Sequence, residues 1–142
     1  MAFNKYPKVT TKFIDTYEYE SVNETGNSVR IDMYDPGNKK AQSPTELLLS
    51  ALAACSAVDM AEILKKRKKT FSSFHIETRG TRREEHPRAF TSITMRFVLV
   101  SENVTREELL KNARLIVDKY CSVATTIKGV ATIEVEADVN PA

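Results

Sequence analysis

The sequence predicts an α+β fold whose elements follow the order ββ-α-ββ-α-β. Several segments alternate apolar and polar side chains with a period of two, which is typical of strands. Two other segments open with a helix-capping signature and continue with apolar residues at helical spacing. Strands that follow each other after short turns run in opposite directions, so we expect antiparallel sheets.

The composition predicts one globular domain that comprises residues 1–142. The 42% of hydrophobic and 28% of charged residues are ordinary for a globular protein, and a net charge of +2 is too small to argue for a nucleic-acid partner. The first residues, MAFNKYPKVTTKF, lack the apolar stretch of a secretion signal. No segment approaches the roughly 18 uninterrupted apolar residues of a membrane span. We therefore expect a cytoplasmic protein without a membrane partner.

The N-terminal part predicts two strands joined by a turn. In residues 8–20, KVTTKFIDTYEYE, one face carries Val9, Thr11, Phe13, Tyr17 and Tyr19. Residues 23–27, NETGN, are turn-forming, and residues 28–34, SVRIDMY, alternate again. This pattern predicts a hairpin, which is followed by a loop over residues 35–42.

A long helix is predicted from Pro44 to about Lys68. Ser43 is expected to cap it, and Glu46 completes a capping box. The first half is apolar nearly all round, which is typical of a helix buried on most sides. A chain this short can hardly surround such a helix, so a second subunit is expected to complete the burial. Small residues would let another backbone approach closely: Ser50, Ala51, Ala53, Ala54 and Ser56.

The end of this helix, KKRKK at residues 65–69, has two interpretations. It could form part of a nucleic-acid patch, or it could be a solvated helix end whose cations complement the terminal carbonyl groups. We favour the second interpretation because no aromatic platform or second dense basic cluster accompanies it.

The second half of the sequence predicts the remaining elements. Residues 71–80 and 88–102 are expected to form strands, and Thr105 opens a second helix with another capping box. A short helical turn ends near Gly129, and residues 130–139 form the last strand. Alternation places two sets of apolar residues each on one face of a strand: Ile93, Met95, Phe97 and Leu99 in the earlier strand, and Ala131, Ile133, Val135, Ala137 and Val139 in the last one.

Two cysteines, Cys55 and Cys121, are the residues that could carry chemistry. They lie 66 positions apart without a CxxC pair, and only two histidines are present, so a zinc site is poorly supported. Cys121 lies where one helix ends and a short helical segment begins, and free amides there favour a thiolate. Cys55 is in mid-helix, and Asp59 one turn later would raise its pKa unless that carboxylate anchors a cation. Either cysteine could instead simply fill space.

The combination of SPTELLLSALAAC at residues 43–55, KYCSV at 119–123 and GVATIEVEADV at 129–139 resembles the OsmC/Ohr family of osmotically inducible and organic hydroperoxide resistance proteins. The resemblance extends from about Val29 to Val139. The segments REEHPRAF and ILKKRKK are similar to a less characterised branch of that family. The resemblance implies an OsmC-like fold, with sheets wrapped around long central helices in an intertwined homodimer.

The resemblance also implies a thiol-dependent peroxidase with its sites at the dimer interface. Cys55 matches the peroxidatic cysteine, which attacks a peroxide and becomes a sulfenic acid. Cys121 matches the resolving cysteine, which condenses with it to an internal disulfide. A dithiol, such as a lipoyl protein, would restore both thiols. No metal, flavin or other cofactor is implied.

The sequence departs from the family pattern at two supporting residues. Members use an arginine from an early glycine-rich loop, but the first arginine here is Arg30, in the following strand. They use a glutamate just after the helix-opening proline, where this chain has Thr45, with Glu46 one position later. Nine residues place Glu46 about half a turn away from Cys55 and about 13 Å along the helix. Glu46 would therefore act only from a partner chain or through an arginine.

Two alternatives to the peroxidase stay open. A non-catalytic dimer could bind an apolar ligand or sense redox conditions through its cysteines. An acyl-transfer enzyme could use Cys55 as its nucleophile, but His86 is expected in a turn and His75 on the solvent side of a strand, so a histidine partner is lacking.

Overall fold

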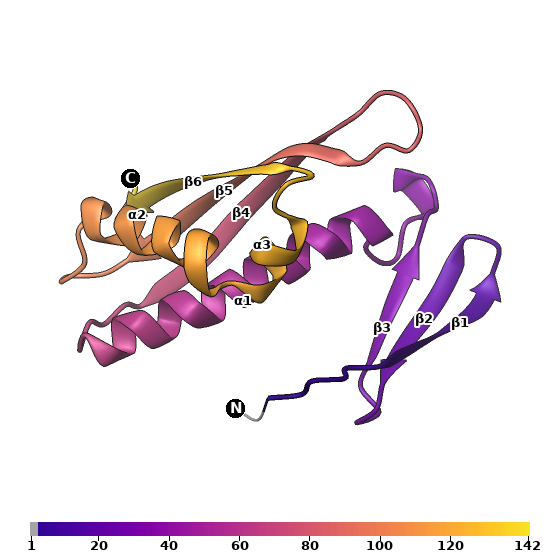
Figure 1. Cartoon of the computed structure of the whole chain (residues 1–142), viewed down its shortest axis with the longest axis horizontal. Helices are drawn as coiled ribbons and strands as arrows, with labels where there is room; N and C mark the ends of the chain where they lie inside the picture. Colours follow the sequence, from indigo (N-terminus) through magenta and orange to yellow (C-terminus); the bar gives the residue numbers. More distant parts are fainter. Residues whose placement is uncertain (1–2) are drawn as a thin grey trace. The chain divides into compact units, whose positions relative to one another are not determined.

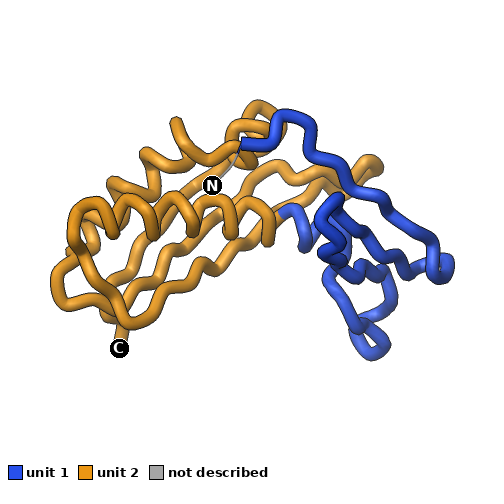
Figure 2. Tube along the Cα trace, turned by 90° about the horizontal axis from the view of Figure 1, so that it is seen from below, with its two compact units in different colours: residues 1–48 blue, residues 49–142 orange. Residues whose placement is uncertain are grey.

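The computed structural model describes residues 3–142. The chain divides into two compact units, Met1–Leu48 and Leu49–Ala142 (Figure 2). Each unit contains a sheet of three strands, and the helices follow from Pro36 onward (Figure 1). The mixed α+β class is thus confirmed, although two details of strand number and direction differ from the expectation.

The sheet of the first unit has three antiparallel strands in the order β1-β2-β3. They are β1 (Val9–Asp15), β2 (Glu18–Asn23) and β3 (Ser28–Asp32). The expectation of a single strand over residues 8–20 is wrong, because the chain reverses between Asp15 and Glu18. A two-residue turn preserves the period-two pattern, so Phe13 and Tyr19 pair across the ladder, and their ring centroids are 5.8 Å apart. The predicted turn at residues 23–27 is confirmed, since Asn27 N donates to Asn23 Oδ1 at 2.8 Å.

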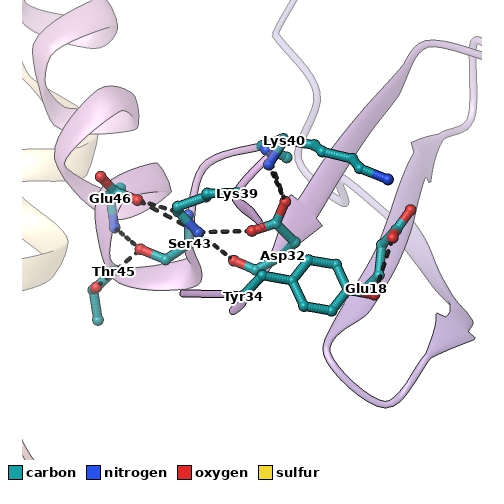
Figure 3. A network of polar contacts seen from close by, with 9 residues as sticks. Glu18, Asp32, Tyr34, Lys39, Lys40, Ser43, Thr45 and Glu46 are labelled. Atoms are coloured by element: carbon teal, nitrogen blue, oxygen red, sulfur yellow. Dashed lines mark hydrogen bonds and ion pairs between the residues drawn. The ribbon is translucent and has the colours of Figure 1, made fainter. Parts of the chain in front are cut away.

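Asp32, at the end of β3, organises the loop before the long helix (Figure 3). Its carboxylate is 1% exposed and accepts hydrogen bonds from Lys39 Nζ and from the backbone N–H groups of Lys40 and Ala41, each at 2.8 Å. This loop contains the short helix η1 (Pro36–Asn38). The Lys39 hydrogen bond holds the pKa of Asp32 below its usual range. A single buried carboxylate therefore fixes the path of the loop.

The capping box at the start of the long helix α1 (Pro44–Lys66) is confirmed. Ser43 N donates to Glu46 Oε1 at 2.9 Å, and Glu46 N donates to Ser43 Oγ at 3.2 Å (Figure 3). The helix ends two residues before the expected Lys68, which has a positive φ of 58°. A residue with left-handed backbone angles ends the run of helical hydrogen bonds.

Only a narrow stripe of α1 is buried: Leu52, Ser56, Met60 and Leu64. Other apolar side chains face solvent, with Val58 47% and Leu48 38% exposed. Within residues 3–142, α1 is the one helix whose length and apolar composition would suffice to cross a membrane, a property that it shares with core helices of soluble proteins. The expected burial on most sides is therefore not reached within a single chain.

The second unit contains β4 (Ser73–Arg82), β5 (Phe90–Val100) and β6 (Thr132–Val139), with β5 in the middle. β4 and β5 are antiparallel, but β5 and β6 are parallel, so the expectation of purely antiparallel sheets is wrong here. The chain between β5 and β6 carries α2 (Arg106–Leu115), the π-helical turn η2 (Ile116–Tyr120) and α3 (Ser122–Ile127). A connection with helices of this length can return to the same end of the sheet, which parallel pairing requires.

The hydrophobic core of the second unit lies against one face of its sheet. The predicted inward residues of β5, Ile93, Met95, Phe97 and Leu99, are at most 1% exposed. They form one cluster with Leu52, Met60 and Leu64 of α1 and with Leu109 and Ala113 of α2. On β6, Ala137 is buried and Ile133, Val135 and Val139 pack against the cluster. The part of α1 that follows Leu49 is thereby packed against the same core as α2.

Candidate functional site

The two thiols are neighbours in the second unit. Cys55 lies on α1, and Cys121 lies directly before α3. The Cys55 side chain is within hydrogen-bonding distance of the Cys121 thiol. Both cysteines are free; Cys121 is fully buried, whereas Cys55 is partly exposed. An attacking thiol must meet its substrate and its partner need not, so this difference suits the two roles that the sequence suggests.

The junction predicted at Cys121 is confirmed. Cys121 has an extended backbone, with φ −75° and ψ 113°, between η2 and α3. Its own N–H donates to Ile116 O at 2.8 Å, and its Sγ accepts a hydrogen bond from Ala124 N at 3.4 Å. The sulfur therefore caps the short helix α3, and this holds the thiol in a defined direction.

Ser56 belongs to the site, although the sequence indicated only that it is a small residue at which another backbone could approach closely. It is fully buried, and its Oγ donates to Cys121 Sγ at 3.4 Å. The signal was present in the spacing, since Leu52, Ser56 and Met60 are four residues apart on one helical stripe. A hydroxyl in a buried stripe requires a hydrogen-bond partner. Ser56 thus connects α1 to the second thiol.

Burial raises the pKa of the Cys121 thiol, and the neighbouring Cys55 raises it further. The hydrogen bonds from Ser56 and Ala124 act in the opposite direction, because a donor stabilises the thiolate. The largest effect is burial, so the net effect is a raised pKa, which favours the protonated form of Cys121.

Asp59, one turn after Cys55, does not anchor the cation that a stabilised thiolate at Cys55 would need. Its Oδ2 atom is buried and has no hydrogen-bond partner within residues 3–142. Burial, and then the negative charge of Glu62, raise the pKa of the Asp59 carboxyl. In the second unit neither sulfur is hydrogen-bonded to an arginine, lysine or histidine side chain.

The second unit also contains a pocket of about 400 Å³. It is lined by Asp59, Glu62, Ile63, Lys66, Arg67, Leu115 and Tyr120, and we call it the Asp59 pocket. Asp59 is one helical turn from Cys55, and Tyr120 directly precedes Cys121. The pocket is of the size that binds small organic molecules.

The two supporting residues that the sequence suggests lie in the first unit. Arg30 pairs with Glu18 at 2.5 Å and with Glu20 at 3.3 Å. Glu46 serves in the capping box, and the Ser43 backbone N–H holds the pKa of Glu46 below its usual range. Each side chain thus has local partners, and a part for Arg30 or Glu46 in a reaction stays a prediction.

The histidines do not complete a nucleophilic pair. His86 lies 2.7 Å from Arg88 in the exposed connection between β4 and β5, and His75 is exposed beside Glu77, as expected for the solvent side of a strand. Neither is hydrogen-bonded to Cys55 or Cys121, so among residues 3–142 the acyl-transfer alternative has no histidine base. Among residues 3–142 no group of three histidine, cysteine or acidic side chains is arranged to hold a metal ion.

The site consists of two free thiols, one on the long helix α1 and one in the crossover that joins the parallel strands β5 and β6. The chain is therefore a two-thiol protein of the α+β class. The OsmC-like protein family model matches residues 37–136, and the chain belongs to this family. Protein YhfA of Escherichia coli K12 is 30% identical over 124 residues, which are 86% of this chain and 90% of YhfA. The resemblance seen in the sequence is thereby confirmed.

Solved structures agree with this assignment. A protein from Aquifex aeolicus has a TM-score of 0.84 at 27% identity, over 96% of this chain and 98% of that one. The organic hydroperoxide resistance protein OsmC of Legionella pneumophila has a TM-score of 0.72 at 13% identity, over 96% and 100% of the two chains. At 13% identity the similarity shows the shared OsmC-like fold alone.

Proposed function

We propose that the protein is a thiol-dependent peroxidase that acts through Cys55 and Cys121. The Cys55 thiolate attacks the O–O bond of a hydroperoxide, which leaves a sulfenic acid on Cys55 and releases an alcohol, or water in the case of hydrogen peroxide. The Cys121 thiol then attacks the sulfenic sulfur, which forms an internal disulfide and releases water. A dithiol reductant, such as a lipoyl protein, reduces this disulfide by thiol–disulfide exchange. The reductant is oxidised to its own disulfide, and both thiols of the protein are restored.

The observation that carries this proposal is the position of the Cys55 side chain next to the Cys121 thiol. A condensation between the two sulfurs requires that they meet, and 66 positions of sequence separate them, so only tertiary packing can provide this proximity. Membership of a family that includes organic hydroperoxide resistance proteins supports the same chemistry.

The proposal includes a homodimer in the cytoplasm. Apolar side chains that a single chain leaves exposed support the dimer: Val58 on α1, and Val9 and Phe13 on β1. Covering such residues is the usual reason for association. Arg30 and Glu46 are the proposed supporting residues, and we propose that they act only when a second subunit is present.

Intact-mass spectrometry of the reduced protein tests the proposal. One equivalent of cumene hydroperoxide, or of hydrogen peroxide in a second sample, should remove two hydrogens and join the Cys55 and Cys121 peptides. The Cys121→Ser variant should stop with one added oxygen on Cys55, and the Cys55→Ser variant should not react. If both thiols of the unmodified protein survive minutes of exposure, the peroxidase proposal is wrong.

One observation favours a second candidate, a non-catalytic dimer that binds a ligand or senses redox conditions. In residues 49–142 no cationic side chain is hydrogen-bonded to either sulfur, although a peroxidatic thiolate normally has such a neighbour. Slow oxidation to the disulfide without turnover in the presence of excess dithiol would favour a sensor over an enzyme.

A further inference from the structure

We propose that the Asp59 pocket binds a short zwitterionic ligand of the class of a di- or tripeptide. The ligand's ammonium group would lie at Asp59 and Glu62, and its carboxylate would lie at Lys66 and Arg67. The proposal concerns binding beside the thiols and does not depend on peroxide turnover.

The charges of the pocket are separated along α1. Asp59 and Glu62 come first, and Lys66 and Arg67 follow on the same side of the helix. With a rise of 1.5 Å per residue, the acidic and basic positions are about 6 to 12 Å apart along the axis. The termini of an extended di- or tripeptide are about 7 to 10 Å apart. A single amino acid is too short to reach both groups of charges.

Three of the four charged side chains make no ion pair of 4.0 Å or less with residues 3–142. Asp59 Oδ2 is buried without a hydrogen-bond partner among residues 3–142, and burial raises the pKa of this carboxyl. Glu62 and Lys66 have the four-residue spacing at which opposite charges ordinarily pair on a helix. Neither makes an ion pair of 4.0 Å or less with any residue that the structure describes. A ligand with one ammonium and one carboxylate group would pair with the exposed Glu62 and the accessible part of the Asp59 carboxyl at one end, and with the exposed Lys66 at the other.

Arg67 is held at its end of the pocket by the rest of the fold. Its Nη1 atom donates to Oδ1 of the fully buried Asn112 at 3.0 Å and lies 3.8 Å from Glu108 Oε1. Within the described residues its Nη2 and Nε atoms donate no hydrogen bond, and they remain available for a carboxylate. A guanidinium group fixed through one nitrogen loses little freedom when a ligand binds.

The middle of the pocket suits a peptide backbone with small side chains. Ile63 and Leu115 provide apolar surface, and Tyr120 also lines the pocket. The volume of about 400 Å³ admits two or three small residues and excludes a folded partner. A bound peptide would lie within one helical turn of Cys55.

Calorimetric titration of the reduced, full-length protein with trialanine tests this proposal, because trialanine has both charged ends and no redox chemistry. We expect saturable binding with a Kd of about 1 mM. N-acetyl-trialanine and trialanine amide, which each lack one charged end, should bind at least about tenfold more weakly. Asp59→Asn and Lys66→Met should have the same effect on trialanine itself. Glu107→Gln and Lys111→Met change exposed charges of α2 outside the pocket and should leave the Kd unchanged.

Absence of saturable binding to the unmodified protein would overturn the proposal, as would equal binding of trialanine and its blocked forms. If Asp59→Asn fails to fold, as judged by circular dichroism, the exposed Glu62→Gln takes its place. An unchanged Kd for both Glu62→Gln and Lys66→Met would show that any binding occurs elsewhere. Since the probe is neither oxidant nor thiol, a failure of the peroxidase assay leaves this result standing, and the reverse is also true.

Discussion

Ser56 and Cys121 are joined by a hydrogen bond of 3.4 Å, although 65 positions of the sequence separate them. The bond connects the thiol-bearing helix α1 to the crossover that carries the second thiol. It also adjusts that thiol, because a hydroxyl that donates to sulfur favours the thiolate over the thiol. One buried serine therefore affects both the packing and the acidity of the site.

Replacement of Ser56 by alanine should raise the pKa of Cys121 further, because burial then acts with one opposing hydrogen bond fewer. We expect slower alkylation of Cys121 by iodoacetamide at neutral pH in a Cys55→Ala background, with the inflection of the rate at a higher pH. The loss of a buried hydrogen bond should also cost about 1 kcal/mol of stability. Ser122→Ala, at an exposed position next to Cys121, is the matched control and should leave the pH profile unchanged.

Cys55→Ala alone should lower the pKa of Cys121, because Cys55 is one of the groups that raise it. Burial is the larger cause and remains, so the pKa should stay above that of an ordinary thiol. The pH dependence of Cys121 alkylation in unfolded and folded samples of the same variant measures this difference. A folded-state value at or below the unfolded one would contradict the burial of Cys121.

Asp32→Asn should lower stability at pH 7 and remove an acid-dependent step. The pKa of Asp32 is lower in the folded than in the unfolded chain, so folding favours the charged carboxylate. This stabilisation is present above the unfolded pKa of about 4 and is lost as the pH falls through the folded value. Urea midpoints between pH 7 and pH 3 should show the loss in the unmodified protein and not in the variant. Asp35→Asn, in the same loop, should behave like the unmodified protein.

Gly80→Ala should destabilise the second unit by about 1 to 3 kcal/mol. A Cβ atom at Gly80 would meet the ring of Phe90 on the paired strand at 2.3 Å, which is far inside van der Waals contact. Denaturant unfolding measures the loss, and the double variant Gly80→Ala/Phe90→Leu should recover part of it. At Gly37 nothing lies within 4 Å of an added Cβ, so Gly37→Ala serves as the control with little change expected.

Val58→Lys should shift the protein from dimer to monomer if the exposed side of α1 forms the proposed subunit interface. Val58 lies opposite the buried stripe of the helix and is 47% exposed in the single chain. A lysine buried there without a counter-ion would weaken association by at least about tenfold. Light scattering after size exclusion reports the mass. Val130→Lys, at a 72% exposed turn, should leave the oligomeric state unchanged.

Features that depend on neighbours in the sequence were predictable. The capping box of Ser43 and Glu46 and the turn at Asn23 involve contacts over three or four residues, and the structure reproduces both. The inward face of β5 was predictable for a similar reason, because alternation along one strand determines which side chains share a face.

Features that depend on tertiary packing were not predictable from the sequence. A two-residue turn leaves the period-two pattern of residues 8–20 intact, so the break between β1 and β2 gave no signal. The direction of β6 follows from where the crossover docks, which side-chain alternation does not encode. The role of Ser56 appears only when Cys121, 65 positions later, is packed against it. For the same reason the Asp59 pocket was not recognised, because its lining combines residues of α1 with Leu115 and Tyr120 of the crossover.

The position of Cys121 in the long crossover between β5 and β6 also orders events during biosynthesis. Synthesis runs from the N-terminus, so the ribosome releases α1 with Cys55 well before the crossover that carries Cys121. Until residue 121 has been synthesised, the nascent chain carries Cys55 without its companion. A chain that stalls or is truncated at this stage presents a lone thiol to every oxidant around it. The two sulfurs can meet only after the crossover has been synthesised and has packed against α1.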